Sequence, residues 1–373
     1  MKPRIIERAS PAHRVWQITG WAILVVAVLV IAKGQPNYRL LLMSNAAALS
    51  VAILGLNLVV GFSGQISLGH SAFFGFGGYT AAVLIVDHDW PFLATLPVAA
   101  LFGGVLGFLL GLPALRIRGL YLALVTLALA IVFPSLAKID QLADLTGGAN
   151  GKPVPVGWHR PSWFPLKVTQ QGWQFLVLAA LAGLLFFLAS NMVRSRAGRA
   201  LVSLRDNEIG ATVSGVYPAG WKTGAFAISA AYASMAGAML TLAIPIVAPD
   251  TGGFVLAIQL ITGLVLGGIG IISGSVVGAL AIVWLPELTR SWGKFLPLFS
   301  ENKTALLANA AYGILLIAMM FVMPGGIMWF VRFVRSKFVR FVPRLPKVSS
   351  LDEDVEVGPI SAATVQQTQG GSA

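Results

Sequence analysis

Long runs of apolar residues, each bounded by charge, proline or a polar cluster, constrain this chain more than any other feature. Most of them extend over about 17 to 25 residues, the length that a helix needs to cross roughly 30 Å of hydrocarbon. Only 11% of the residues are charged and 57% are hydrophobic, whereas roughly 25% of the residues of a soluble protein are charged. The sequence therefore predicts an all-α fold, a polytopic transmembrane helical bundle, and excludes a soluble domain.

Ten of these runs qualify as candidate spans, so we predict about ten crossings of the bilayer. The ninth run is the weakest, because it is short and ends at Pro286 and Glu287. If it re-entered the membrane instead of crossing it, nine spans would remain. The ten runs are Trp16 to Ala32, Leu40 to Phe62, Ser67 to Val86, Phe92 to Leu112, Leu120 to Ala137, Gln174 to Met192, Thr223 to Val247, Phe254 to Ile272, Ser275 to Leu288 and Ala305 to Val322.

The positions of the basic residues predict the orientation, because cytoplasmic loops of membrane proteins are enriched in Lys and Arg. With ten spans and a cytoplasmic N-terminus, most of the 26 Lys and Arg residues lie on the cytoplasmic side. With nine spans, the basic residues between Arg332 and Lys347 would move outside and the bias would invert. We therefore predict ten spans with both termini in the cytoplasm. The net charge of +12 is then a topology signal, and no nucleic-acid partner is expected.

Three segments are expected along the chain: a cytoplasmic N-terminal segment over residues 1–15, a transmembrane domain over residues 16–345 and a tail over residues 346–373. The basic stretch before the first run resembles a signal peptide, but no small-x-small cleavage site follows it. We therefore expect a retained first span. Beyond Lys347 the tail carries only acidic charges and no apolar periodicity, which predicts a disordered cytoplasmic segment.

Two connections inside the transmembrane domain are long enough to have structure of their own. Residues 138–173 form the first, a periplasmic loop that we expect to be a small ordered cap, since structureless connections of this length are uncommon. Residues 193–222 form the second, a cytoplasmic loop. Its composition predicts a helix over Arg199 to Val213, ended by Pro218 and Gly220.

The spans carry essentially no Asp, Glu, Lys or Arg away from their ends, and only His70 could titrate there. Ion-coupled carriers place ionisable groups in mid-membrane to bind the coupling ion, so the energy for active transport is expected on another subunit. The chain has no Cys, and no paired carboxylates, metal-ligand spacing or nucleophile–base arrangement is present. We therefore expect no catalytic residue, no metal site and no cofactor.

A polar, glycine-rich and uncharged segment from Gly61 to His70 interrupts two spans. Irregular backbone at membrane depth is tolerated only when it is buried in protein or lines an aqueous cavity. A second uncharged connection, Gly270 to Gly278, has the same predicted orientation and suggests a parallel repeat. Polar residues that a solute path could use are Asn45, Asn57, Gln65, Ser67, His70, Gln259 and Thr262. Hydrogen bonds between helices are the alternative role for each of them.

Small residues recur at helical spacing in the spans. Gly103, Gly107 and Gly111 share one helix face, as do Gly263 with Gly267 and Gly270 with Gly274 and Gly278. Such spacing allows helix backbones to approach closely, so helix packing is the expected role of these glycines.

The stretch from Gly55 to Ala82, which contains Gly-Phe-Ser-Gly-Gln-Ile-Ser-Leu-Gly-His, closely resembles the signature of the M-type permease subunit of branched-chain amino acid ABC importers. Two further segments agree with that family in order and spacing. One is Thr146-Gly147-Gly148-Ala149-Asn150-Gly151 in the outer loop. The other is Arg205-Asp206-Asn207-Glu208-Ile209, followed by Gly215 and Lys222. The resemblance covers about residues 40 to 330.

The resemblance implies a permease subunit of an ATP-binding-cassette importer in the bacterial inner membrane, which moves Leu, Ile or Val. Its implied partners are a second, H-type permease, two ATPase subunits that hydrolyse the ATP, and an extracytoplasmic solute-binding protein. The chain itself would not be an enzyme. By the same resemblance, the coupling loop to the ATPase contains Arg205, Asp206, Glu208 and Gly215. The outer-loop motif contains Thr146, Gly147, Gly148, Asn150 and Gly151.

Three alternatives stay open at this point. Relatives with the same topology carry urea, short amides or aromatic acids, so the solute could belong to one of these classes. A passive channel or an ion-coupled carrier is the alternative of a different functional class. Lipid headgroups could hold the basic loop over residues 199–222, although Asp206 and Glu208 argue against it because anionic headgroups repel them.

Overall fold

The computed structural model describes residues 4–7, 19, 25–114, 119–155, 159–162, 164, 168–293, 313–314, 317–318, 321 and 325–342. The chain divides into two compact units, residues 1–21 with 335–373, and residues 22–334. In the first unit, β1 (Arg4–Glu7) pairs in parallel with β4 (Val339–Val342). The predicted tail over residues 346–373 lies outside the described residues.

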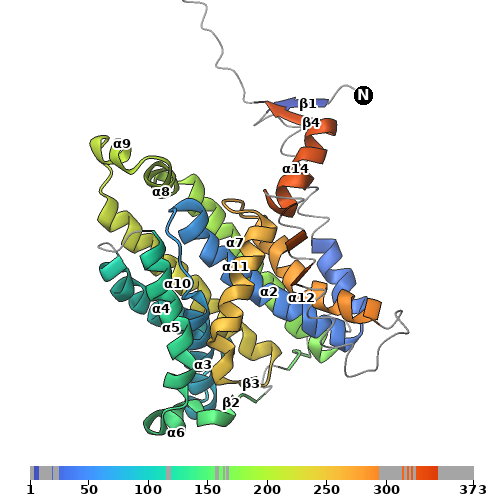
Figure 1. Cartoon of the computed structure of the whole chain (residues 1–373). Helices are drawn as coiled ribbons and strands as arrows, with labels where there is room; N and C mark the ends of the chain where they lie inside the picture. Colours follow the sequence, from blue (N-terminus) through green and yellow to red (C-terminus); the bar gives the residue numbers. More distant parts are fainter. Residues whose placement is uncertain are drawn as a thin grey trace, which may run out of the picture. The chain divides into compact units, whose positions relative to one another are not determined.

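The second unit is a bundle of apolar helices, as predicted (Figure 1). Five helices of the described residues are long and apolar enough to cross a membrane, or six if the bent pair Tyr121–Ala137 and Asp140–Thr146 is one span. The first predicted span is described mainly from Val25 to Gly34, and the tenth lies largely outside the described residues. The count of ten spans therefore stays a prediction.

The helices of the bundle follow the predicted runs closely. They are α2 (Asn37–Asn57), continued by the π-helix η1 (Leu58–Phe62), α3 (His70–His88), α4 (Phe92–Ala114), α5 (Leu120–Ala137), α7 (Gln170–Arg194), α10 (Pro218–Ala243), α11 (Phe254–Gly267) and α12 (Gly274–Gly293). The ninth predicted span corresponds to α12, which continues through Pro286 instead of ending there. α14 (Gly326–Phe338) follows the last predicted span.

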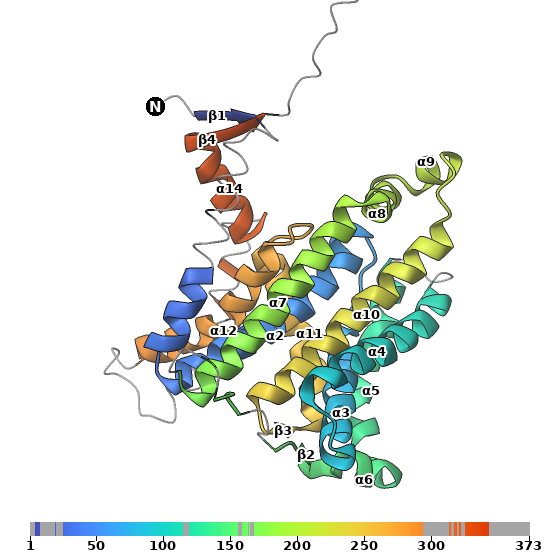
Figure 2. The same cartoon turned by 180° about the vertical axis from the view of Figure 1, so that it is seen from behind.

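Two helices occupy the centre of the bundle. In their most apolar windows, 83% of the α2–η1 helix and 78% of α10 are buried, against 28% of α4 and of α7. α10 packs against α2, α3 and α4, and α2 packs against α7 and α12. Figure 2 shows α7 running beside α10 along one side of the bundle. α4 and α7 therefore present the apolar outer surfaces that lipid or another apolar partner must cover.

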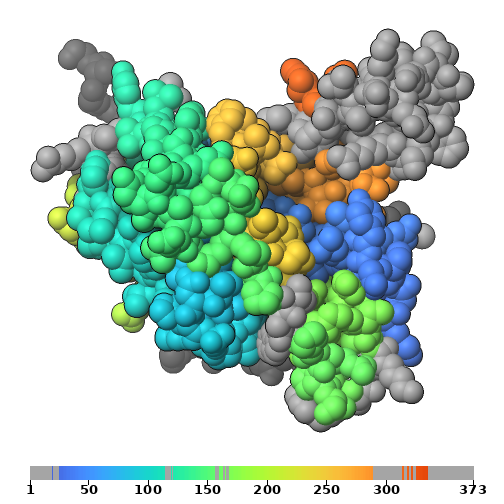
Figure 3. All heavy atoms as spheres, turned by 90° about the horizontal axis from the view of Figure 1, so that it is seen from below, coloured from blue at the N-terminus to red at the C-terminus, as the bar shows by residue number. Residues whose placement is uncertain are grey.

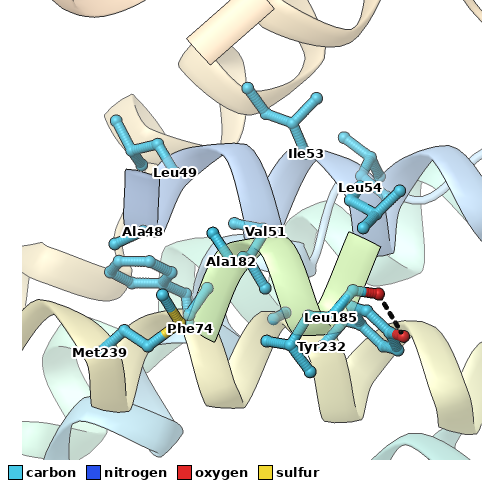
Figure 4. Close-up of a cluster of buried hydrophobic side chains, with 14 of the residues drawn as sticks. Ala48, Leu49, Val51, Ile53, Leu54, Phe74, Ala182, Leu185, Tyr232 and Met239 are labelled. Carbon is cyan, nitrogen blue, oxygen red and sulfur yellow. Dashed lines mark hydrogen bonds between the residues drawn. The ribbon is translucent and has the colours of Figure 1, made fainter. Parts of the chain in front are cut away.

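The core between these helices is built from aliphatic and aromatic side chains. Figure 4 shows Val51 and Leu54 of α2 lying near Leu185 of α7 and Tyr232 of α10. The Tyr232 hydroxyl donates a hydrogen bond to the carbonyl oxygen of Leu185 over 3.1 Å. The hydroxyl group of Tyr232 is therefore satisfied by a hydrogen bond inside the bundle, as a polar group in an apolar core requires.

The small-residue faces pack helices together, as predicted. A Cβ atom added at Gly103, Gly107 or Gly111 of α4 would meet Ser234, Ala230 or Thr223 of α10, respectively. Between α11 and α12, Gly278 faces the backbone of Gly263, and Gly274 faces that of Gly267. These glycines therefore allow the close backbone approach that van der Waals packing of membrane helices needs.

Connections that we predict on the outer side of the membrane gather at one end of the bundle. They contain η2 (Asp140–Leu142), α6 (Ala143–Thr146), η3 (Gly148–Asn150), β2 (Lys152–Pro153), β3 (Ile246–Val247) and η4 (Pro249–Gly252). β2 pairs with β3 in antiparallel fashion, and η3 contacts η4. In Figure 3, which looks onto this end, the green surface of the α5–β2 region lies beside the blue surface of α3. The described part of residues 138–173 is thus an ordered cap.

Candidate functional site

The glycine-rich segment after α2 breaks the helix, as predicted from its composition. α2 first loosens into the π-helix η1, and residues Ser63 to Gly69 are irregular before α3 begins at His70. Gly64 has a φ of +73°, a conformation that side chains rarely adopt. The Gln65 amide donates to the Val59 carbonyl over 3.0 Å, which turns the chain back onto η1. π-helices are frequent at functional sites, and this one was not predicted from the sequence.

Asn57 joins this break to the second uncharged break, between α11 and α12. Its side chain is fully buried, and its Oδ1 accepts from the Gly270 amide over 2.8 Å. Its Nδ2 donates to the Ile271 carbonyl over 3.0 Å and to Ser275 Oγ over 3.4 Å. A Cβ atom at Gly61 would lie 2.6 Å from the Gly270 nitrogen. The two glycine-rich breaks therefore touch, and only a residue without a side chain fits at Gly61.

Arg205 reaches this junction from the loop between α7 and α10. Its Nη1 donates to the Gly61 carbonyl over 2.6 Å, and its Nε donates to Asp206 Oδ1 over 2.9 Å. Its aliphatic stem lies beside Gly64, where an added Cβ atom would be 2.8 Å from Arg205 Cγ. The carbonyl oxygens at a helix C-terminus carry partial negative charge, so the guanidinium is well placed at the end of η1. We call Asn57, Gly61, Arg205 and Gly270 the junction.

Gln65 makes a second link between the break and the same loop. Its Nε2 donates to Ser63 Oγ over 2.6 Å and to the Lys222 carbonyl over 3.1 Å. Lys222 Nζ in turn pairs with Glu208 Oε1 over 2.8 Å. A path of polar contacts therefore runs from Glu208 to the break between α2 and α3.

The loop itself contains two helices instead of the single predicted one. α8 (Arg196–Asp206) ends before Asn207, whose extended backbone starts α9 (Glu208–Val213) and whose Oδ1 accepts from the Gly210 amide. The expectation of one helix over Arg199 to Val213 was wrong, because Asn207 is a strong N-cap and separates the two helices. Pro218 does not end a helix either: it occupies the first turn of α10, where a missing amide hydrogen is tolerated.

Gly215 ends the second of these helices. Its φ is +85°, and the Val216 amide donates to the Ala211 carbonyl over 3.0 Å. This geometry is the usual C-terminal stop of a helix and favours glycine. Gly215 therefore turns the chain from α9 toward α10.

α9 presents an apolar surface to solvent. Ile209 is 80% exposed, Val213 is 86% exposed and Tyr217 is 71% exposed. Ile209 and Val213 are four positions apart and share a face of α9, and Tyr217 lies beyond the turn at Gly215, before α10. We call them the α9 tip. Exposed apolar groups that lie close together are typical of contacts with a protein or a membrane.

His70 is a buried structural residue in this geometry. The Ser229 hydroxyl donates its single hydrogen to the Gly55 carbonyl over 2.5 Å. Ser229 Oγ can therefore only accept in its second bond, so His70 Nε2 is the donor to Ser229 Oγ over 2.6 Å. His70 Nδ1 is then the acceptor that faces Ser67 Oγ at 3.5 Å. His70 and Ser229 thus hold α3 against α10 and α2.

The seven predicted path residues fall into two groups. Asn57, Gln65, Ser67 and His70 are buried and paired inside the bundle, as described above. Asn45 of α2 and Gln259 and Thr262 of α11 are partly exposed, and none of the three makes a side-chain hydrogen bond to another described residue. Polar groups inside a membrane protein usually have such partners, so these three side chains differ from the other four in their unused hydrogen-bonding capacity.

The outer-loop motif forms a tight glycine turn. Thr146 Oγ1 donates to the Ala137 carbonyl over 2.7 Å and accepts from the Gly148 amide over 3.2 Å. Gly147, Gly148 and Gly151 all have positive φ angles, and Asn150 lies in the short helix between them. The turn leads to Lys152, whose buried ammonium pairs with Asp87 Oδ2 over 2.6 Å. The motif therefore has a structural role in the cap.

The structure identifies several residues of the site that were not predicted from the sequence. Ser229 and Val213 carried no signal, because serines and valines are common on such helices. Tyr217 was overlooked, although it is an aromatic residue in a basic loop. Lys222 was noted only as part of the resemblance, and its ion pair to Glu208 could not be read from their separation of fourteen positions.

Comparisons with known proteins agree with this architecture. The family described as "Branched-chain amino acid transport system / permease component" matches residues 38–324. The chain is 34% identical over 268 residues to "High-affinity branched-chain amino acid transport system permease protein LivM" of Escherichia coli (strain K12), covering 65% of this chain and 61% of the relative. The chain thus matches about three fifths of that relative's length.

A second relative is the "High-affinity branched-chain amino acid transport system permease protein LivH" of Escherichia coli (strain K12). It is 26% identical over 292 residues, which cover 74% of this chain and 89% of the relative. No solved structure matches the chain. The apolar helices and the family match show a multi-pass membrane protein. The chain belongs to the branched-chain amino acid transport system permease family.

Proposed function

We propose that the chain is a permease subunit of an ATP-binding-cassette importer that carries branched-chain amino acids across the bacterial inner membrane. The names of its relatives support the solute class. The family is one of transport permeases and not of enzymes. ATP hydrolysis is accordingly assigned to separate ATPase subunits, as expected for a transport permease.

The junction is the observation that carries this proposal. An importer driven by a separate ATPase needs a mechanical link between its cytoplasmic loop and the backbone that opens or closes the path. Arg205 and the Glu208–Lys222 pair connect α8 and α9 to the break between α2 and α3, while Asn57 extends the connection to the break before α12. A movement of the loop would therefore be transmitted to both irregular segments at once.

The α9 tip is the proposed contact with the ATPase. Ile209, Val213 and Tyr217 expose apolar surface beyond the bundle, and a partner with a complementary cleft would bury it. Glu208 is not available as a simple docking charge, because it pairs with Lys222. Docking would accordingly rest on apolar contact at the tip, and Glu208 would transmit the movement inward.

A second permease is the partner proposed for the transmembrane face. This chain is similar both to the M-type and to the H-type relative of one organism, which supports an assembly of two homologous permeases. Asn45, Gln259 and Thr262 would then border the solute path, since their polar groups are partly exposed. The solute-binding protein would dock on the opposite, capped end and supply the affinity.

The sidedness of this proposal follows the basic residues. The loop with α8 and α9 and both uncharged breaks meet at one end, and all three are predicted to be cytoplasmic. Lys138 pairs with Asp250, and Lys152 with Asp87, among connections that are predicted to be periplasmic. The parallel pairing of β1 with β4 supports an even number of spans, because it brings the two terminal segments to the same side.

Reconstitution tests the proposal. The chain, an H-type permease, two ATPases and a binding protein from the same source would be incorporated into vesicles, and uptake of labelled leucine, isoleucine and valine would be measured with and without ATP. ATP-dependent uptake that also requires the binding protein is expected. Uptake by vesicles that lack the ATPases would instead identify a channel or an ion-coupled carrier. ATP-dependent uptake of urea, an amide or an aromatic acid alone would correct the solute class.

A further inference from the structure

Buried and exposed residues alternate along the irregular segment between η1 and α3. Ser63, Gln65 and Ser67 are buried, whereas Gly64 and Ile66, which lie between them, are exposed. The Ile66 side chain is 45% exposed although it is large and apolar. The polar side chains of this break are therefore enclosed by the bundle, and the large side chain that the break exposes is apolar.

The second break, between α11 and α12, has the same character. Ile269 is 52% exposed. It lies between Gly268 and Gly270, whose φ angles of +109° and +74° are rarely adopted by residues with side chains. Because glycine populates many backbone conformations, the backbone on both sides of Ile269 is able to change direction. Each of the two breaks that meet at the junction thus exposes an isoleucine.

Arg205 lies against both breaks, next to these isoleucines. An added Cβ atom would lie 2.8 Å from Arg205 Cγ at Gly64 and 3.6 Å from Arg205 Nη1 at Gly270. Gly64 precedes Ile66 by two positions, and Gly270 directly follows Ile269. A displacement of Arg205 would therefore move the backbone that carries each isoleucine.

Both isoleucines lie beside the helices that border the proposed solute path. The Leu68 amide donates to Thr126 Oγ1 of α5 over 2.9 Å, which fixes the first break against α5. α5 contacts α11, the helix that carries Gln259 and Thr262, and Ile269 follows the last residue of α11 by two positions. Irregular backbone at membrane depth is tolerated only when it is buried in protein or lines an aqueous cavity. We therefore expect the exposed side chains of both breaks to face such a cavity.

From these observations we propose that Ile66 and Ile269 are this chain's part of an apolar gate, which closes the junction end of the solute path when the two side chains meet. The gate rests on the proposed function, a path along α11 that is shared with a second permease. An amino acid is a zwitterion with tightly bound water, so a constriction of apolar side chains, which excludes water, blocks it. Movement of α8 would carry Arg205 along and separate the two isoleucines.

Enlarged side chains provide the first test, in vesicles that contain the complete importer. Ile66→Trp and Ile269→Trp should each lower ATP-dependent leucine uptake by about tenfold or more, because the ring fills the constriction, while the ATPases remain bound. Val105→Trp is the matched control, since Val105 is 50% exposed on the outer surface of α4 and should tolerate the ring. Undiminished uptake by either isoleucine variant would place that side chain in lipid or cytosol and overturn the gate. Loss of the ATPases would identify an ATPase contact instead and would also overturn it.

Reversible cross-linking provides the second test, and the absence of Cys in the native chain makes it direct. In the variant with Ile66→Cys and Ile269→Cys, a mild oxidant should join the two side chains and stop leucine uptake, and a reductant should restore it. Each single variant, treated in the same way, should keep uptake. Failure to form the disulfide, or uptake that survives it, would overturn the gate while ATP-dependent uptake by the native importer leaves the proposed function standing. If the native importer takes up no branched-chain amino acid, the proposed function itself is wrong.

Discussion

The guanidinium of Arg205 donates from Nη1 to the carbonyl oxygen of Gly61 over 2.6 Å. These residues are 144 positions apart in the sequence, and the bond ties the loop between α7 and α10 to the end of a π-helix. A hydrogen bond from a charged donor contributes about 1.5 to 3 kcal/mol, toward the lower end here because the Arg205 side chain is 37% exposed. This bond, together with the contact of Gln65 with the Lys222 carbonyl, therefore ties the loop to the break.

Gly61→Ala should destabilise the bundle, because the added methyl group would meet Asn57 Oδ1 and lie 2.6 Å from the Gly270 nitrogen. Such overpacking costs about 1 to 3 kcal/mol. Gly224→Ala in α10 is the matched control, since nothing lies within 4 Å of its added Cβ atom; it should be neutral or stabilise by about 0.5 to 1 kcal/mol. Thermal unfolding of the purified chain in detergent measures both. Equal stability of the two variants would mean that the breaks do not touch.

Ile209→Asp together with Val213→Asp should abolish binding of the ATPase subunits without unfolding the chain. The two side chains are 80% and 86% exposed, so the folded state loses almost no packing. Charged groups in a buried apolar contact cost several kcal/mol. Co-purification of the ATPases measures the loss, and Ser214→Asp, an exposed position away from the face of Ile209 and Val213, is the control. Full association of the double variant would remove the α9 tip from the docking surface.

Asp87→Asn should destabilise the outer cap, because it leaves the buried ammonium of Lys152 without its carboxylate. Breaking a buried ion pair costs about 3 to 5 kcal/mol, and we expect about 1 to 3 kcal/mol because the Asp87 side chain is 33% exposed. Adding Lys152→Met should recover part of that loss. A double-mutant cycle of thermal stability provides the coupling energy; additive effects would show that the pair contributes nothing.

Gln259→Leu and Thr262→Val should lower the maximal rate of uptake while leaving the binding protein's dissociation constant for its solute unchanged. Both side chains are partly exposed and lack a described hydrogen-bond partner, so their loss should not unfold α11. Ser234→Ala is the contrasting variant: its hydroxyl donates to the Phe73 carbonyl over 2.9 Å, so stability should fall by about 1 kcal/mol. If the α11 variants transported at the unchanged rate, the solute path would lie elsewhere.

The helices could be predicted because apolar runs report the membrane directly. The predicted segment Leu120 to Ala137 matches α5 at both ends, and Leu40 to Phe62 ends with η1 at Phe62, although α2 begins three residues earlier, at Asn37. The break after Gly61 could also be predicted, because uncharged glycine and serine do not continue a helix. The division of the loop at Asn207 was missed, since a single capping residue was outweighed by the helical composition around it.

The candidate site could be predicted only as a set of residue types. Asn57, Gln65 and His70 were identified as polar residues of spans, but their partners Gly270, Lys222 and Ser229 lie far away in the sequence. A periodic pattern describes one helix and contains no information on which helix packs against it. The distinction between paired residues and partly exposed ones, such as Gln259, therefore had to come from the three-dimensional structure.

The most direct measurement of the central claim compares ATP hydrolysis and leucine uptake in the same vesicles for Arg205→Met, with Arg199→Met on α8 as the matched control. The account predicts that Arg205→Met keeps the ATPases bound and hydrolysing within about twofold, while uptake falls by about tenfold or more, the effect of losing a bond of about 1.4 kcal/mol or more. Arg199→Met should retain both activities. Undiminished uptake by assembled Arg205→Met would contradict the claim that the junction couples the loop to the path.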